Sequence, residues 1–299
     1  MLENRQNKSK LSDKYIAGFL DADGSISLYW RKVDRADTNP ETRRGYIALR
    51  FTQQTKKDEV LYKIQENIGG KISFYENKEA TELLIFGNKA QNILNRIKKH
   101  LVIKRHYANV VLDMAKKVYN SKQARIYLKE QRKIRSLPLP NYPPRQWLAG
   151  YFDGDGCLCA RLPRKRNSVQ PTFEITSSDY DSEGIEIINK AFGGSINIFG
   201  KNKNLIKLTI TMPPSKAKKI LGYFAKHLIT KKEQAYFILG CASMEHYHDG
   251  NNIKEAMKQL KVHPHRLNEP KPDVSLLLSK IKDIKFKATY KRRQYKKVG

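Results

Sequence analysis

The sequence is poor in acidic residues and in long apolar stretches, and each shortage excludes a class of protein. Only 29 Asp and Glu residues stand against 58 Lys and Arg residues, which gives a formal net charge of +29 over 299 residues. A field of this size predicts an anionic partner, and nucleic acid is the commonest polyanion. No run of 18 apolar residues occurs, so we expect no membrane-spanning segment and no role in a membrane.

Cysteine is also scarce. The chain has three cysteines, and the two-residue spacing of Cys157 and Cys159 suits neither a disulfide framework nor a zinc site. The first ten residues lack the apolar core of a secretory signal. We therefore expect an intracellular protein that works in a reducing compartment. Hydrophobic residues make up 39% of the chain, which is enough to build a core.

An internal repeat organises the chain. Residues 16–24 read IAGFLDADG and residues 148–156 read LAGYFDGDG. A Gly-Gly pair at 69–70 and again at 193–194 follows in the same order. Shared landmarks with small changes in length predict two homologous domains. We expect four parts: a first repeat at 1–120, a basic, proline-rich linker at 121–142, a second repeat at 143–265 and a basic C-terminal tail at 266–299.

Each repeat has the pattern of a helix, two strands, a helix, two strands and a helix. Alternation in residues 46–52 places Ile47, Leu49 and Phe51 on one face of a strand and polar residues on the other. Residues 206–211 alternate in the same way. This pattern predicts an α+β fold whose antiparallel sheets are covered by helices on the apolar face. In so basic a chain, we interpret the polar face as a nucleic-acid platform rather than a merely solvated surface.

The repeated motif has the features of a helix that packs against its own copy. Ser12 suits the N-cap of a helix that contains the first motif. The small residues at 17–18 and 149–150 would let two backbones approach closely, so we expect the two motif helices to form the domain interface. Gly24 and Gly156 suit the left-handed conformation that often ends a helix.

Asp23 and Asp155 would then lie at helix C-termini, where a carboxylate is disfavoured by the helix dipole and by its neighbour. A divalent cation between them would remove both penalties. Carboxylate oxygens, with the backbone carbonyls of Ala22 and Gly154 as further ligands, favour Mg²⁺. One such Asp-x-Asp-Gly segment is usually only a turn with a capping aspartate. Its duplication favours a metal site.

Residues 12–262 resemble the LAGLIDADG homing endonuclease family in its monomeric two-repeat form, because both nine-residue motifs are close to the family signature. The resemblance implies two αββαββα domains with saddle-shaped antiparallel sheets, related by a pseudo-twofold axis, which lie in successive major-groove segments of double-stranded DNA. It implies a site-specific, metal-dependent endodeoxyribonuclease that hydrolyses one phosphodiester in each strand of a long, non-palindromic target. Such proteins are often intron-encoded, so we expect a mitochondrion, a chloroplast or a bacterial cytoplasm.

The resemblance also assigns roles to the acidic residues of the motif. The last acidic residue of each signature is the metal ligand of the family, which here is Asp23 or Asp155. Asp21 and Asp153 occupy positions that mainly support the helix ends. Mg²⁺ is the expected cofactor, and Ca²⁺ or Mn²⁺ is expected to be able to take its place in structures.

Polar residues around the motif are assigned in the same way. Lys104 and Lys231 match the basic residue that begins the last helix of each repeat and stabilises charge on the phosphate. Gln53 matches the residue that orders water at the end of the second strand. Ser177 stands there in the second repeat, so the two sites are expected to differ, and Lys57 adds a basic contact in the first repeat alone.

Candidate base readers are the side chains on the polar faces of the strands. In the first repeat they are Ser25, Ser27, Tyr29, Arg31, Tyr46, Arg50, Thr52, Lys71, Ser73 and Tyr75. In the second repeat they are Cys157, Cys159, Arg161, Gln170, Thr172, Glu174, Thr176, Asn197, Lys207 and Thr209. The two sets differ, which predicts a target that is not palindromic. Some of these side chains would contact only phosphate or water.

Two other functions fit the same fold. One is an RNA maturase that assists group I intron splicing, with intron RNA as its partner and no need for the acidic pair. The other is a DNA-binding regulator without catalytic activity. Retention of Asp23 and Asp155, together with Lys104 and Lys231, favours cleavage over both.

Overall fold

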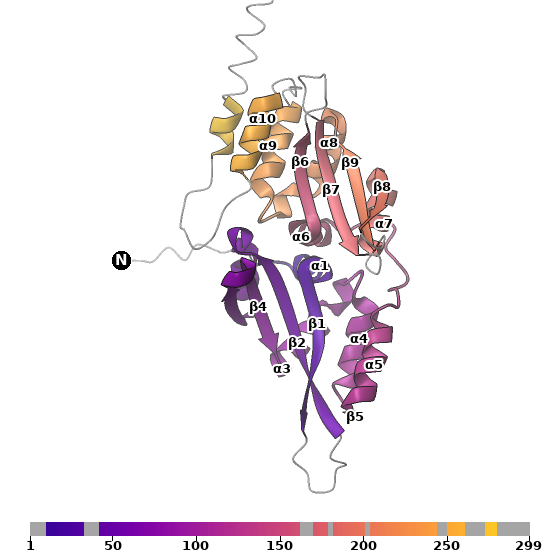
Figure 1. The fold of residues 1–299 in the computed structure, drawn as a ribbon. Coiled ribbons are helices and arrows are strands. Elements are labelled where there is room, and N and C mark those ends of the chain that lie inside the picture. Colours follow the sequence, from indigo (N-terminus) through magenta and orange to yellow (C-terminus); the bar gives the residue numbers. More distant parts are fainter. Residues whose placement is uncertain are drawn as a thin grey trace, which may run out of the picture.

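The computed structural model describes residues 10–32, 42–161, 170–178, 182–200, 204–243, 250–260 and 273–279. The fold consists of two halves, each an antiparallel sheet with helices, which meet at helices α1 (Asp13–Asp23) and α6 (Arg145–Asp155) (Figure 1). None of the helices in these ranges has the length and apolar character needed to cross a membrane. The basic tail predicted at 266–299 lies outside the described residues, apart from 273–279.

The first half continues from α1 into a sheet with strand order β1-β2-β4-β3. Its elements are β1 (Gly24–Lys32), β2 (Thr42–Gln54), α2 (Glu59–Ile68), β3 (Lys71–Tyr75), β4 (Ala80–Phe86), α3 (Asn88–Ile97) and α4 (Arg105–Met114). A short strand, β5 (Val118–Asn120), pairs with the far end of β2 and leads into α5 (Ser121–Gln131). Helix α5 thus begins the segment predicted as a linker.

The second half repeats this plan after α6, with strand order β6-β7-β9-β8. Its elements are β6 (Gly156–Arg161), β7 (Gln170–Ser178), α7 (Glu183–Phe192), β8 (Ser195–Phe199), β9 (Leu205–Thr211), α8 (Pro214–Phe224), α9 (Lys232–Ser243) and α10 (Gly250–Gln259). Short 3₁₀ turns occupy Thr55–Lys57, Glu76–Lys78, Lys98–His100 and Ala225–His227. The predicted αββαββα order is confirmed, and it is followed by the additional helices α4 and α5 in the first half and α9 and α10 in the second.

The two faces of each sheet differ as the alternation predicted. Ile47, Leu49 and Phe51 on β2 are buried in the core, whereas Arg50 is half-buried and Thr52 is exposed on the opposite face. The helices cover the apolar face, so the polar face stays open. The Gly-Gly turns precede β3 and β8 as expected, and their φ values of 66° and 117° at 69–70 and 67° and 141° at 193–194 lie in the region that favours glycine.

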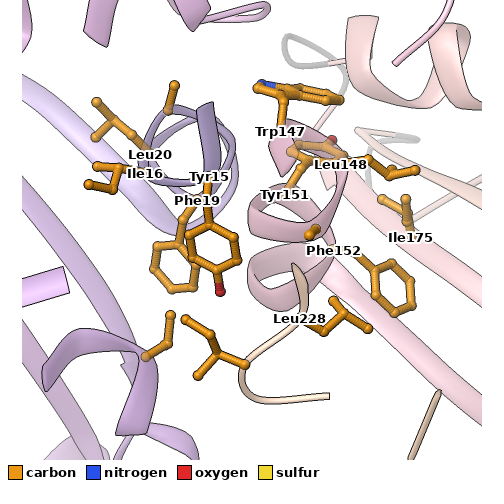
Figure 2. Packing of buried hydrophobic residues seen from close by; sticks show 14 of the residues in the cluster. Tyr15, Ile16, Phe19, Leu20, Trp147, Leu148, Tyr151, Phe152, Ile175 and Leu228 are labelled. Atoms are coloured by element: carbon orange, nitrogen blue, oxygen red, sulfur yellow. The ribbon is translucent and has the colours of Figure 1, made fainter. Parts of the chain in front are cut away.

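Helices α1 and α6 cross in direct backbone contact. A Cβ atom on Gly18 would lie 2.0 Å from the carbonyl oxygen of Trp147, and one on Gly150 would lie 2.0 Å from that of Tyr15. Any larger residue at either position would push the helices apart. Figure 2 shows the buried side chains that fill the space on either side of this crossing, with Phe152 lying beside Ile175. The predicted interface between the motif helices is confirmed.

The predicted N-cap of α1 is confirmed, whereas the predicted conformation at the C-terminus of both motif helices is wrong. Ser12 caps α1 as expected, with its Oγ accepting from the backbone N–H of Tyr15 at 3.2 Å. Gly24 and Gly156, however, are not left-handed, because their φ values are −115° and −80°. Glycine is required there for space: a Cβ on Gly24 would lie 2.7 Å from the carbonyl oxygen of Leu20.

Replacement of Gly18 by alanine should destabilise the protein by about 3 kcal/mol or more, because the new Cβ meets backbone that cannot rotate away. Gly222→Ala is the matched control, since Gly222 lies in α8 and a Cβ added to it would have no neighbouring atom within 4 Å. That change should be neutral or stabilise by up to about 1 kcal/mol. Urea unfolding followed by circular dichroism measures both. Equal stability of the two variants would contradict the tight crossing.

Candidate active site

The C-terminal ends of the two motif helices converge. A Cβ on Gly154 would lie 2.5 Å from the Cβ of Ala22 and 3.2 Å from the backbone nitrogen of Asp23. Gln53, at the end of β2, spans the junction: its Nε2 lies 3.1 Å from Oδ2 of Asp23 and 3.5 Å from the carbonyl oxygen of Asp153. Two of the predicted site residues, Asp23 and Gln53, therefore meet where the two halves join, beside the end of α6 that carries Asp155.

Asp21, the first acid of the first motif, is buried and accepts hydrogen bonds from four donors. The backbone N–H groups of Val102, Ile103 and Lys104 donate to its carboxylate at 2.7, 3.2 and 2.8 Å. The fourth donor is the indole Nε1 of Trp147, at 2.8 Å, which belongs to the other half. Asp21 thus holds the segment before α4 against the end of α1, and it ties the two halves together.

Asp153 repeats this arrangement in the second half. Its carboxylate accepts from the backbone N–H groups of Ile229 and Lys231 at 2.7 and 3.0 Å, and from the hydroxyl of Tyr15 at 2.6 Å. Burial, followed by the nearby Asp153 carboxylate, raises the pKa of Tyr15 well above 10, so its hydroxyl remains a donor. Tyr15 and Trp147 each stand six positions before the aspartate of their own motif, and each binds the aspartate of the other.

The two predicted phosphate-binding lysines point at the helix ends. The Nζ of Lys104 donates to the carbonyl oxygens of Leu20, Asp21 and Gly24 at 2.8, 2.8 and 2.9 Å. The Nζ of Lys231, which is buried, donates to the carbonyl oxygen of Asp153 at 2.5 Å. A cation stabilises the negative end of a helix dipole. Each lysine therefore stabilises the backbone that carries the acidic pair, and contact with a phosphate stays a prediction.

The electrostatics couple the halves as well. Burial raises the pKa of Asp23, and Lys231 opposes this rise more strongly than Lys104 does, although Lys231 belongs to the other half. Burial in turn lowers the pKa of Lys231, and the neighbouring Lys57 lowers it further. A desolvated carboxyl group of this kind gains from a bound cation, which stabilises its charged form.

The donor set fits a magnesium ion. Asp23 and Asp155 offer carboxylate oxygens, and no group of three or more His, Cys, Asp or Glu side chains that could hold a metal gathers anywhere in the described residues. Mg²⁺ commonly takes one or two protein carboxylates and completes its shell with water and substrate phosphates, whereas structural zinc needs a closed set of side chains. The Nζ of Lys104 lies 3.4 Å from the carbonyl oxygen of Ala22, one of the two predicted backbone ligands.

An aromatic and basic cluster lies on the polar face of the first sheet. The ring of Phe86 is stacked against Tyr46 at 6.1 Å and meets Tyr29 edge-on at 5.6 Å. The guanidinium of Arg31 lies 5.4 Å from the Tyr46 ring, and that of Arg50 lies 5.3 Å from the Tyr29 ring. Phe86 was missing from the predicted set, although the alternation in β4 could have placed it on this face.

Among the described residues, an ion pair lies on the polar face of each sheet, and the two pairs have opposite polarity. In the first half the Nε of Arg50 on β2 lies 3.7 Å from Oε1 of Glu82 on β4. In the second half Glu174 on β7 takes the place of Arg50, and Lys207 on β9 takes that of Glu82, with Nζ and Oε2 2.5 Å apart. Glu82 was also missing from the predicted set, although it lies on the same face of β4 as Phe86 and the same alternation could have placed it there.

Most other predicted base readers are at least partly accessible. On the first sheet these are Ser25, Ser27, Tyr29, Arg31, Tyr46, Arg50, Thr52, Lys71, Ser73 and Tyr75. On the second sheet they are Cys157, Cys159, Gln170, Thr176, Asn197, Lys207 and Thr209. Thr172 and Glu174 are buried and hydrogen-bonded to each other at 3.1 Å, so they could contact a ligand only after a local change. The side chain of Arg161 lies outside the described part of the chain.

The comparisons with known proteins agree with this architecture. The family model described as LAGLIDADG endonuclease matches residues 16–124 and 148–242. The crystal structure of the LAGLIDADG homing endonuclease I-GzeII in complex with its DNA target is 16% identical, with a TM-score of 0.62, over 84% of this chain and 97% of that one. The meganuclease I-SmaMI bound to uncleavable DNA is 20% identical, with a TM-score of 0.60, over 85% and 96%. No curated protein matches the chain.

Tyr15→Phe should lower the free energy of unfolding by about 1–3 kcal/mol, because it leaves the buried carboxylate of Asp153 with one donor fewer. Tyr236→Phe is the control, since Tyr236 is exposed on α9. The free energy of unfolding of this variant should lie within about 0.5 kcal/mol of that of the parent. Urea titration of the parent and both variants gives the comparison. A Tyr15→Phe protein as stable as the control would show that this bond between the halves contributes nothing.

Proposed function

Because the chain belongs to the LAGLIDADG endonuclease family, we propose that it is a site-specific enzyme that cuts both strands of a long, non-palindromic DNA duplex. The observation that carries the proposal is the convergence of the C-terminal ends of α1 and α6, which carry Asp23 and Asp155, at the junction of the two halves (Figure 1). One chain contains both halves, so a monomer would suffice.

Asp23 and Asp155 would hold Mg²⁺, or Ca²⁺ or Mn²⁺ in its place. The ion would supply Lewis-acid stabilisation of phosphate charge and a more acidic bound water. Gln53 would orient the carboxylate of Asp23 and a water molecule beside it, because its amide already lies 3.1 Å from that carboxylate. Lys104 and Lys231 would fix the helix ends and add positive charge where negative charge develops on the scissile phosphates.

The polar faces would read the target. Arg50 could bind guanine through two hydrogen bonds, and Glu174 could accept a hydrogen bond from cytosine once it is released from Lys207. The reversed ion pairs would give the half-sites different preferences at equivalent positions, which explains a non-palindromic target. The net charge of +29 supports strong contact with phosphates, so binding should weaken steeply as salt rises.

Asp23→Asn and Asp155→Asn should each abolish cleavage of both strands while DNA binding is retained. The expected loss in rate is at least about a hundredfold, the scale seen when a group that stabilises transition-state charge is removed. Asp113→Asn is the control, because Asp113 is exposed on α4 and its carboxylate forms an ion pair at 2.8 Å with Lys116, a residue outside the predicted site. A supercoiled library of candidate targets incubated with Mg²⁺ measures cleavage, and a gel shift in Ca²⁺ measures binding.

The controls separate three results. Full activity of the Asp113→Asn variant together with loss in the other two supports the site. Cutting that survives in both motif variants would refute the assignment of Asp23 and Asp155. Splicing assistance by an intron RNA maturase would persist in both variants.

Gln53→Ser should slow one strand more than the other, because it makes the first half resemble the second, where Ser177 stands at this position. Loss of an outer-shell partner of a metal ligand commonly costs about 10- to 100-fold. Nicked circles should therefore accumulate before linear DNA appears. Gln54→Ser, at the next position of the same strand, should keep the parent ratio of nicked to linear product. An unchanged ratio of nicked to linear product in both variants would show that Gln53 takes no part in the reaction.

A further inference from the structure

Two thiols lie in contact on strand β6. Cys157 and Cys159 are separated by the buried Leu158, so both project from the face of the sheet that is turned away from the core. Their Sγ atoms are 3.3 Å apart. Both residues are half-buried, which leaves them within reach of a small ion.

We propose that this pair is a binding site for a soft, thiol-preferring ion, of which copper(I) is the biological example. Two sulfurs that alone hold one copper(I) ion lie on nearly opposite sides of it, at about twice a metal–sulfur bond of roughly 2.3 Å. The two Sγ atoms, 3.3 Å apart in the structure, reach that separation when the side chains rotate apart about their Cα–Cβ bonds. On binding, each thiol loses its proton to solvent and forms one bond to the ion, and no electron is transferred.

The coordination number decides between candidate ions. The described residues provide no third Cys, His, Asp or Glu that could join the two sulfurs on a metal. A structural zinc ion needs four protein ligands, so it is disfavoured. Thiolates select copper(I) among the ions that accept such a soft donor set. The site is therefore expected to be a two-sulfur site that depends on the presence of both thiols.

The position of the pair gives the site a consequence that rests on the proposed function. Strand β6 follows α6 directly after Asp155 and lies beside β7 (Figure 1). In this strand pair Cys157 and Cys159 lie opposite Glu174 and Thr172. An ion held there would occupy the surface offered to the target by the second half. The first half has Ser25 and Ser27 at the equivalent positions of β1, and hydroxyls bind soft ions poorly. Bound copper would therefore weaken contact with only one of the two half-sites of the target.

The test of binding uses the full chain with copper(I) supplied as its bicinchoninate complex. The parent should remove one copper(I) per chain from the competitor, and Cys157→Ser and Cys159→Ser should each lose that copper. Cys241→Ser is the control and should retain it, because Cys241 is buried in α9 and burial raises its pKa to about 12. The serine substitutions copy the first half at equivalent sheet positions, and circular dichroism checks that each variant is folded.

Two results would overturn the copper site: copper retained equally by both strand variants, or copper lost by the Cys241→Ser variant. A loss of two hydrogen masses by the parent without bound copper would also overturn it, because that product is a disulfide. Copper stoichiometry is measured without DNA, so it stands or fails independently of nuclease activity.

The second arm measures DNA binding with and without one equivalent of copper(I), each variant being compared with its own copper-free affinity. The parent should bind its target at least tenfold more weakly with copper and recover when bathocuproine is added, whereas the Cys157→Ser and Cys159→Ser proteins should show no copper effect. Copper binding at one equivalent with unchanged target affinity would overturn the placement of the site on the DNA-binding face.

Discussion

The close crossing of α1 and α6 is the constraint on which the rest of the structure depends. Gly18 lies against the backbone of Trp147, and Gly150 lies against the backbone of Tyr15, so neither position has room for a side chain. At this separation the helix ends bring Ala22 and Gly154 into contact. The acidic pair is therefore placed by backbone packing, which deforms far less than side chains on loops do.

The same crossing explains the exchange of hydrogen bonds between the halves. With the backbones in contact, Tyr15 reaches Asp153 and Trp147 reaches Asp21. A buried carboxylate is costly unless donors surround it, and each aspartate obtains one donor from the opposite half. Neither half alone provides all of the hydrogen-bond donors that its buried aspartate binds. Separation of the halves would thus carry an electrostatic cost in addition to the exposure of apolar surface, which favours a rigid junction under the acidic pair.

Local patterns in the sequence predicted the duplication, the strand faces, the Ser12 cap and the helix interface, because each depends on neighbouring residues or on an exact repeat. Features that depend on contacts between distant segments were not predictable in this way. The bond between Trp147 and Asp21 depends on the helix crossing, and the contacts of Lys104 with the end of α1 depend on how a segment distant in sequence folds back onto that helix. For Gly24, a sequence cannot distinguish a need for positive φ from a need for space, and the latter applies.

The two halves are alike where packing constrains them, and they differ on the polar sheet faces that would contact the DNA. Asp21 and Asp153 bind equivalent backbone donors, and the turns before β3 and β8 have similar geometry, because packing constrains both halves alike. The polar faces have no such constraint. There the ion pair of Arg50 with Glu82 becomes that of Glu174 with Lys207, with the charges exchanged between strands. Exchange conserves the cross-strand attraction that stabilises the sheet, while it inverts the charge presented at each position. A duplicated scaffold can therefore diverge in recognition without loss of stability, provided that substitutions on this face occur as complementary pairs.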